Sequence, residues 1–259
     1  FVPARNDEER YLMRHIEDLA RTASSRGIAR YSGFLSDREQ QLAQAALNRT
    51  DMPEDEIRFD GGWPGAERKL LCLEPVDSYP ASPLCCVRLQ CRALPGAQLP
   101  VHKDYLGSLM GLELRREALG DIVLPEDQLG VAYVFALEPA AELICQELRQ
   151  AGHTDLTAEM QPLETLPAFP QAERPRQTAT VSSLRLDAVL AAMLRCSRGM
   201  AAELVTAGRV EINHLPAESV HAPVYEDDVF TVRGKGRFQL TALPGKSKKD
   251  RLIIEYFQY

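Results

Sequence analysis

The sequence lacks the long apolar runs and paired cysteine motifs of a membrane protein or a secreted disulfide framework. No stretch approaches the roughly 18 apolar residues that a transmembrane helix needs, and the opening residues are charged rather than apolar. None of the 6 cysteines forms a C-x-x-C pair, and several fall at apolar positions of expected strands and helices. We therefore expect reduced thiols, a cytoplasmic protein and no membrane partner.

The sequence is also poor in the residues from which metal and catalytic centres are built. Cys85, Cys86, Cys91 and His102 are close along the chain, but the first two point to opposite sides of an expected strand and no second ligand pair follows. The 5 histidines are scattered, so no Ser, His and Asp set is specified, and no P-loop is present. We predict no metal, no cofactor and no small-molecule substrate.

Charge is distributed unevenly. The net charge of −7 argues against nucleic-acid binding when the chain is taken as a whole. From Thr180 to Tyr259, however, basic residues outnumber acidic ones, and the remainder of the chain carries the entire acidic excess. Because local patches rather than total charge determine phosphate binding, the C-terminal third is the candidate nucleic-acid end.

The N-terminal region, residues 1–75, is predicted to be mainly helical. Apolar residues at helical spacing indicate a helix over residues 7–24. A second helix is expected from Ser36, because Glu39 follows it in capping-box spacing, and it should end near Asn48. The stretch "FDGGWPGAERKL" is rich in glycine and proline and predicts a turn.

The middle region, residues 76–162, reads as β-α-β-β-α-β, the order of a ferredoxin-like or RNA-recognition-motif-like domain. Tyr133 and Phe135 share one face of the strand "GVAYVFAL". In an RNA-recognition motif such rings stack on bases, but apolar residues in this pattern are more often core, which is the role we favour. Trp63 leaves two roles open, namely stacking on a base and packing under a loop.

Prolines punctuate residues 163–179, which we interpret as a linker. The final region, residues 180–259, begins with the amphipathic helix "SSLRLDAVLAAMLR". A second helix follows in "SRGMAAELVTAG", with Ser197 as its cap and Gly208 as its left-handed stop. Strands are expected in "RVEIN", "DVFTVRG", "RFQLTAL" and "RLIIEYF".

The second of these helices is a candidate phosphate-binding element. Arg198 lies at its positive N-terminal end, and Arg209 follows its last turn. Helix N-termini and guanidinium groups both favour phosphate oxygens, although two solvated arginines are the simpler alternative.

The order of these parts resembles the S4 RNA-binding domain. That family opens one helix with R-L-D and the next with S-R-x-x-A, and it continues with G-x-V-x-V-N and a G-D-x-I strand. The matching positions are Arg185, Leu186, Asp187, Ser197, Arg198, Ala201, Gly208, Arg209, Val210 and Asn213. Two departures stand out: His214 replaces the glycine that usually follows the asparagine, and Asp227 replaces the glycine of G-D. The resemblance implies two helices on a small sheet that binds structured RNA.

Further motifs narrow the resemblance to the YlmH family of bacterial RNA-binding proteins. They are "GGWPGAERKLL", "HKDYLGSLMGLELRREALGDI", "TATVSSLRLD" and "VRGKGRFQLTALPGKSKKDRLII". The resemblance implies an α+β chain with an N-terminal region, an RNA-binding middle domain and a C-terminal S4 domain. It also implies action on the large ribosomal subunit, including subunits that hold stalled peptidyl-tRNA, with rRNA and possibly tRNA as partners.

The predicted RNA contacts lie in both halves of the chain. In "RGKGRF", alternate basic residues would share one side of an extended segment, and two glycines would let a ligand approach the backbone. A flexible basic hairpin tip is the simpler alternative. The tail "GKSKKDR" and the ends of the helix in "HKDYLGSLMGLELRRE" add further cations. The candidates are Arg185, Ser197, Arg198, Arg209, Asn213, Arg233, Lys235, Arg237, Lys246, Lys248, Lys249, His102, Lys103, Arg115 and Arg116.

We predict no catalytic activity. The strongest enzyme alternative is an rRNA-modifying pseudouridine synthase, because many of these enzymes carry an S4 domain. The only R-L-D here is Arg185-Leu186-Asp187, and it lacks the Thr-Gly turn that follows the catalytic aspartate in those enzymes. The second alternative is a ribosome-assembly or docking factor that uses the S4 domain without binding RNA.

Overall fold

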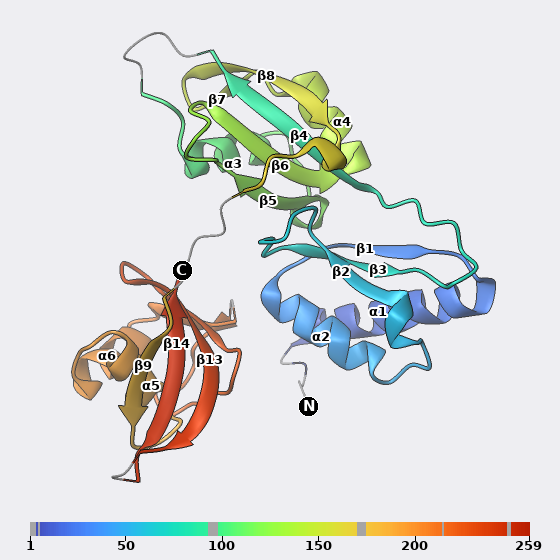
Figure 1. The fold of residues 1–259 in the computed structure, drawn as a ribbon. Helices are drawn as coiled ribbons and strands as arrows, with labels where there is room; N and C mark the ends of the chain where they lie inside the picture. The colour runs from blue at the N-terminus through green and yellow to red at the C-terminus, as the bar shows by residue number, and fades with distance from the viewer. Residues whose placement is uncertain (1–3, 5, 93–97, 170–174, 214, 248–249) are drawn as a thin grey trace. The chain divides into compact units, whose positions relative to one another are not determined.

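The computed structural model describes residues 4, 6–92, 98–169, 175–213, 215–247 and 250–259. The chain divides into two units, Phe1–Gln171 and Ala172–Tyr259 (Figure 1). Among the described residues, no helix is both long enough and apolar enough to cross a bilayer.

The first unit begins with two helices, of which the second has the predicted ends and the first extends two residues beyond the predicted range of 7–24. α1 (Asp7–Arg26) is capped by Asn6, whose side chain accepts from the Glu9 amide, and it stops at Gly27 in the left-handed conformation. α2 (Asp37–Leu47) carries the predicted capping box between Ser36 and Glu39. The two helices are joined by a buried ion pair, in which the Arg38 guanidinium donates to both carboxylate oxygens of Glu9 at 3.0 Å.

A three-stranded antiparallel sheet accompanies these helices, and sequence periodicity did not reveal it. Its strands are β1 (Arg30–Leu35), β2 (Ile57–Asp60) and β3 (Lys69–Leu73), in the order β1-β3-β2. The central strand β3 is buried along nearly its whole length, so its residues read as a continuous apolar run rather than an alternation. The N-terminal region is therefore helical with an added sheet.

The rest of the unit has the predicted β-α-β-β-α-β order. Its elements are β4 (Leu84–Cys91), α3 (His102–Met110), η2 (Arg116–Ala118), β5 (Leu119–Val123), β6 (Val131–Leu137), α4 (Glu138–Glu147), β7 (Gln150–Ala151) and β8 (Thr154–Gln161). All pairings are antiparallel, in the order β5-β6-β4-β8-β7. Without the short β7, this is the strand order of a ferredoxin-like sheet.

The two sheets of the first unit share a hydrophobic core. Phe34, Leu70 and Cys72 from the N-terminal sheet cluster with Cys86, Tyr133 and Phe135 from the other sheet. Phe169 closes this core, with its ring 5.0 Å from that of Tyr133 and 5.6 Å from that of Trp63. Tyr133 and Phe135 are only 4% and 0% exposed, which confirms their core role and excludes base stacking.

Partly buried polar contacts stabilise the same junction between the two sheets. The Asp121 carboxylate, on β5, accepts from the amides of Glu67 and Arg68 and from the Trp63 indole. The Arg68 guanidinium donates to the carbonyls of Phe34, Leu119 and Arg116. Trp63 thus packs under a loop, and the "GGWPGAERKL" motif forms a joint between the two sheets.

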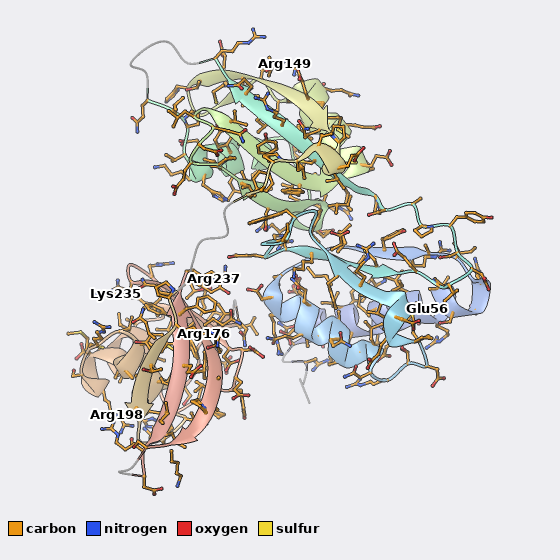
Figure 2. All side chains as sticks on the ribbon, viewed as in Figure 1. Glu56, Arg149, Arg176, Arg198, Lys235 and Arg237 are labelled. Carbon is orange, nitrogen blue, oxygen red and sulfur yellow. The ribbon has the colours of Figure 1, made fainter. Side chains whose placement is uncertain are left out.

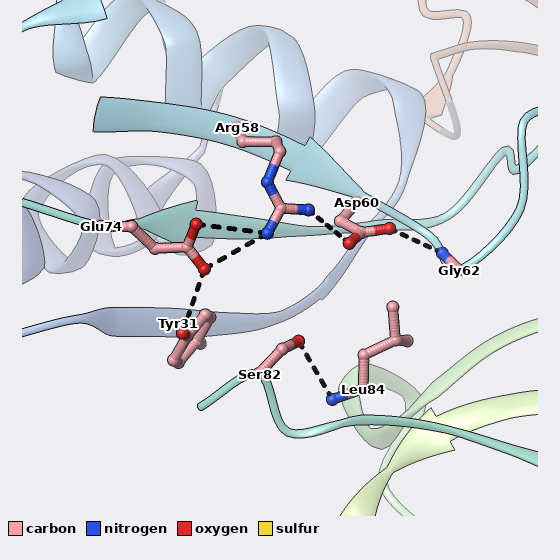
Figure 3. A network of polar contacts seen from close by, with 7 residues as sticks. All are labelled: Tyr31, Arg58, Asp60, Gly62, Glu74, Ser82 and Leu84. Carbon is pink, nitrogen blue, oxygen red and sulfur yellow. Dashed lines mark hydrogen bonds and ion pairs between the residues drawn. The ribbon is translucent and has the colours of Figure 1, made fainter. Parts of the chain in front are cut away.

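A more exposed polar network crosses the N-terminal sheet (Figure 3). Arg58 bonds to Asp60 and to both oxygens of Glu74, and the Tyr31 hydroxyl donates to Glu74 at 3.1 Å. Burial, followed by the contact with Glu74, raises the pKa of Tyr31 to about 12. Both terminal nitrogens of Arg58 donate to carboxylates on or next to the strands of this sheet, so we assign the network a structural role.

The second unit places two helices on one face of a six-stranded sheet (Figure 1). The helices are α5 (Leu186–Met193) and α6 (Arg198–Thr206), and the strands are β9 (Gln177–Val181), β10 (Val210–Ile212), β11 (Leu215–Pro216), β12 (Val229–Val232), β13 (Gly236–Lys246) and β14 (Leu252–Gln258). The sheet order is β11-β10-β12-β13-β14-β9. Leu186, Val189, Leu204, Phe230 and Tyr256 are among the residues of its single core.

Residues 163–179, predicted as a linker, contain more structure than expected. A 3-10 turn spans Leu163–Thr165, and Leu166 and Phe169 pack on the core of the first unit. At the other end, β9 begins at Gln177 and pairs with β14 from Gln177 to Val181. The sheet of the second unit therefore takes a strand that begins before residue 180.

We predict that β9 is needed for an independently stable second unit. A fragment of residues 175–259 should unfold cooperatively, whereas residues 182–259 should be less stable by about 2 kcal/mol or more. The shorter fragment loses Val181 from the core and leaves one edge of β14 unpaired. Thermal and urea unfolding, followed by circular dichroism, measures the difference. Equal midpoints would contradict a structural role for β9.

Candidate nucleic-acid interface

The centre of the candidate interface is Asp187, a buried carboxylate shared by two arginines. Its side chain is 8% exposed, whereas those of Arg185 and Arg198 are 41% and 49% exposed. The Arg185 guanidinium donates to both carboxylate oxygens at 3.1 Å, and Arg198 Nη2 donates to Oδ2 at 2.8 Å. The carboxylate thus holds two guanidinium groups at the surface, side by side.

The fold explains why this carboxylate is buried. Leu186 is fully buried in the core at the start of α5, and the adjacent Asp187 is therefore buried as well. The loop before β12 covers the helix start, where the amides of Leu186 and Asp187 donate to the carbonyls of Ala222 and Val220. His221, in the same loop, contacts the Arg185 guanidinium through Nδ1. Sequence reasoning did not find His221, because no local pattern links it to a helix 36 residues earlier.

The electrostatics favour the ionised carboxylate. Burial raises the pKa of Asp187, but hydrogen bonds from Arg198 and Arg185 oppose it and leave the pKa below the ordinary aspartate value. Asp187 therefore stays charged at neutral pH. Its negative charge offsets only part of the two positive charges, so a net positive patch remains at the surface.

Helix α6 has the predicted ends. The Ser197 hydroxyl accepts from the Met200 amide at 3.2 Å, and Gly208 adopts the left-handed conformation at φ 65°. Arg198 occupies the first turn, and Arg209 follows the last turn. The Ser197 side chain thus has a capping role in the structure. A helix of 9 residues is about 13 Å long, so the two arginines lie at opposite ends of α6.

Four basic residues form a second group at the far end of α6. We call this group the hairpin cluster: Arg209, Arg233, Lys235 and Arg237. The Arg209 guanidinium donates to the Arg233 carbonyl at 2.8 Å. Figure 2 shows Arg198 at one end of the unit and Lys235 with Arg237 at the other. The prediction of an extended "RGKGRF" segment is wrong, and the alternative of a hairpin tip is the one that the structure shows, because residues 233–235 form the turn between β12 and β13.

Within the hairpin cluster, the side chains differ in environment. Arg233 and Lys235 are exposed. Arg237 is half-buried, and its guanidinium carbon lies 4.1 Å from the centre of the Tyr259 ring in a cation–π contact. The backbone is therefore not extended over residues 233–237, and the side chains of Arg233, Lys235 and Arg237 are not equally exposed.

Asn213 is a structural residue rather than a surface contact. It is 3% exposed, its amide nitrogen donates to Asp228, and its oxygen accepts from the Val229 amide. Its backbone is left-handed at φ 50°. Asp227 is also left-handed, at φ 66°, which explains why the S4 pattern has glycine there. His214 lies outside the described residues.

The remaining candidates are scattered. Lys246 pairs with Asp250 at 2.7 Å, and Lys248 and Lys249 lie outside the described residues. In the first unit, His102 and Lys103 are exposed in the first turn of α3, whereas Arg115 and Arg116 are exposed near η2. Arg115 lies 3.8 Å from Glu117. Among the candidates that the structure describes, Arg185 and Arg198 are the pair that a shared carboxylate joins into a defined site.

No group of three or more metal-ligating side chains occurs among the described residues. Cys85 is half-buried and Cys86 is buried, and burial raises the pKa of both thiols. These thiols are therefore protonated at neutral pH and pack as core side chains.

Comparison with known proteins identifies the second unit as an S4 domain. The family model of the S4 domain matches residues 184–230, which include α5, α6 and the shared Asp187. The chain is also similar to the ribosome-associated protein quality control protein P2 of Bacillus subtilis (strain 168), with 33% identity over 255 residues that cover 97% of this chain and 95% of that protein.

A solved structure supports the fold. The cell division protein ylmH from Streptococcus pneumoniae matches with a TM-score of 0.52 at 13% identity, covering 64% of this chain and 99% of that one. The chain belongs to the YlmH family, as its full-length similarity to the Bacillus relative shows.

We predict that Asp187 contributes stability that disappears in acid. Because its pKa is lowered by folding, the contribution is present above the ordinary aspartate pKa of about 3.9 and is lost as pH falls through the lower folded value. Asp187→Asn should therefore cost about 1–2 kcal/mol at pH 7, a range kept modest because both arginines are partly solvated. The difference should shrink below pH 4.

Urea unfolding of the parent and variant at several pH values measures this effect. Glu203→Gln, an exposed change on α6, is the control and should differ from the parent by no more than about 0.5 kcal/mol at any pH. A pH-independent cost for Asp187→Asn would show that its charge does not stabilise the fold.

Proposed function

We propose that the chain is a non-catalytic RNA-binding factor that acts on the large ribosomal subunit in quality control of stalled peptidyl-tRNA. The observation that carries this proposal is the pair of partly exposed arginines, one at the start of α5 and one at the start of α6, that the buried Asp187 holds. The printed name of the Bacillus relative supports the ribosome-associated role. Its partners would be rRNA and tRNA, and its compartment would be the cytoplasm.

The arrangement suits phosphate recognition for three reasons. Guanidinium groups bind phosphate oxygens through paired donors, and ordering them in advance reduces the entropic cost of binding. The N-terminus of α6 adds a partial positive charge beside Arg198. The hairpin cluster supplies further cations about one helix length away, so a backbone could be contacted at both ends of α6.

An rRNA-modifying activity receives no support from the site. A catalytic aspartate must reach a base, but both oxygens of Asp187 accept hydrogen bonds from arginines and its side chain is 8% exposed. The loop of His221 covers the start of α5 as well. Asp187 is better explained as the residue that positions the arginines.

We predict that removing two charges of the hairpin cluster weakens binding through electrostatics alone. Arg209→Gln with Lys235→Gln should reduce affinity for large ribosomal subunits, and the slope of log affinity against log salt should fall by roughly 0.7–0.9 for each phosphate that is no longer neutralised. Both side chains are exposed, so stability should change by no more than about 0.5 kcal/mol. Filter binding at several salt concentrations and thermal melting measure the two effects.

The control for this experiment is Glu203→Gln, which removes a negative charge from the exposed surface of α6 and should leave binding unchanged or slightly tighter. Arg198→Glu is unsuitable, because it would place a carboxylate against the buried Asp187. Co-sedimentation of the parent with large subunits in sucrose gradients, followed by sequencing of crosslinked RNA, tests the proposal directly. A protein that remains at the top of the gradient and retains no RNA would be a docking factor instead.

We also predict no base modification. Total rRNA incubated with the protein should show no new pseudouridine and no released product. Sequencing of carbodiimide-treated RNA detects the modification at single-nucleotide resolution. New pseudouridine that disappears with Asp187→Asn would establish an enzyme instead.

A further inference from the structure

His221 lies beside the arginine pair but belongs to neither α5 nor α6. Its side chain is exposed, although the backbone on both sides of it is held in place. The carbonyls of Val220 and Ala222 both accept from amides at the start of α5, at 3.1 and 2.9 Å respectively. The side chains of the same two residues pack on the core of the second unit. The loop therefore presents the imidazole ring from a fixed position next to α5.

The contact with Arg185 determines which ring nitrogen of His221 carries the proton. A guanidinium group donates hydrogen bonds but cannot accept them. Because Arg185 Nη2 contacts Nδ1 of His221, Nδ1 is the acceptor, and the single proton of the neutral ring is on Nε2. Nε2 has no hydrogen-bond partner among the residues that the structure describes. The exposed ring therefore offers one N–H donor to a ligand.

Each arginine of the pair also keeps one terminal nitrogen for a ligand. Arg185 uses Nε and Nη2 on Asp187, and its Nη2 meets His221 as well. Arg198 uses the same two nitrogens, both on Oδ2 of Asp187. Within the described part of the chain, Nη1 of neither arginine has a hydrogen-bond partner. The two Nη2 atoms are within about 6 Å of each other, because both contact Oδ2, so the unused donors belong to neighbouring guanidinium groups.

We propose that His221 is the third ligand of a site for a single RNA phosphate, together with Arg185 and Arg198. The inference rests on the proposed RNA-binding function and deepens it, since it names the bound group and a residue that binds it. Phosphate oxygens accept several hydrogen bonds at once, and N–H donors to an ionised acceptor form strong ones. Asp187 balances one of the two guanidinium charges. A neutral third donor strengthens the site without the repulsion that a third cation would bring.

Two amide variants separate the possible contributions of the ring. The side-chain oxygen introduced by His221→Asn lies near the position of Nδ1 and can accept from Arg185, but no donor then reaches the position of Nε2. The longer side chain introduced by His221→Gln supplies an N–H donor near the position of Nε2. If the ring donates to a phosphate, His221→Gln preserves binding and His221→Asn does not. If the ring only orients Arg185, His221→Asn preserves binding.

Filter binding of the full chain to large ribosomal subunits at pH 8 and several salt concentrations measures these effects. His221→Ala and His221→Asn should weaken binding about 5-fold, whereas His221→Gln should stay within about 2-fold of the parent. Because a neutral donor releases no counterion, the slope of log affinity against log salt should be the same in all variants. Their melting temperatures should match, since the side chain is exposed. His153→Ala removes an exposed ring from the first unit and is the control, with no expected effect.

Nitrogen NMR of the full chain with isotopically labelled histidine observes the ring directly, and His221→Gln assigns its signals by their loss. The free protein at pH 8 should show the Nε2–H tautomer. Inorganic phosphate should shift the Nε2 signal saturably, whereas chloride and acetate at equal ionic strength should not. An Nδ1–H tautomer, an Nε2 signal that does not respond to phosphate, or an equal response to acetate would overturn the site.

The binding series provides independent grounds for rejection. Parent-like binding by His221→Asn, equal losses in both amide variants, or a changed salt slope would overturn the role of His221 as a neutral phosphate ligand. Large-subunit binding by the parent that persists in those cases would leave the proposed function intact. A parent that binds no large subunits would overturn the proposed function, and the phosphate titration would still decide whether His221 is a ligand.

Discussion

The shared ion pair at Asp187 is the constraint on which the candidate interface depends. A buried carboxylate is costly unless charged donors satisfy it, and here two arginines from different elements do so. Satisfying the carboxylate fixes the start of α5 against the start of α6 and orders two guanidinium groups at the surface. One residue thus connects the packing of the helices with the electrostatics of the surface.

Hydrogen-bonded ionisable side chains also stabilise the junction between the two sheets of the first unit. Asp121 and Arg68 are partly buried, and both form hydrogen bonds with backbone groups: Asp121 with the amides of Glu67 and Arg68, and the Arg68 guanidinium with carbonyls of three segments. Burial raises the pKa of Asp121 and lowers that of Arg68. Both shifts reflect the loss of hydration that the charged groups undergo at the junction between the sheets. The core around Phe169 adds apolar contacts to this joint and thereby covers a sheet face that RNA-recognition motifs leave open.

The contrast between the two sheets bears on how the chain could handle RNA. In the first unit, the aromatic residues of β6 are buried in the core between the two sheets. In the second unit, α5 and α6 pack on one face of the sheet, and the aromatic side chains Phe257 and Tyr259 are half-buried outside that core. The distribution of charge agrees with this difference, since the basic excess lies in the second unit.

Local signals in the sequence determined much of the fold. The capping box at Ser36, the cap at Ser197 and the stop at Gly208 were predictable, because each depends on hydrogen bonds within a few residues. The β-α-β-β-α-β order followed from periodicity, and the S4 pattern identified the arginine-bearing helices.

Tertiary structure decided what each surface residue does. Nothing local shows that β3 is buried on both faces, that Asn213 is enclosed in its turn, or that His221 meets Arg185. These outcomes depend on strand register and on contacts between distant segments, which neither propensity nor spacing encodes. The sequence by itself therefore determined the presence of the helices, the ends of α2 and α6, and the class of the second unit. Only the tertiary structure decided which charged and aromatic side chains remain at the surface, because their exposure depends on what packs against them.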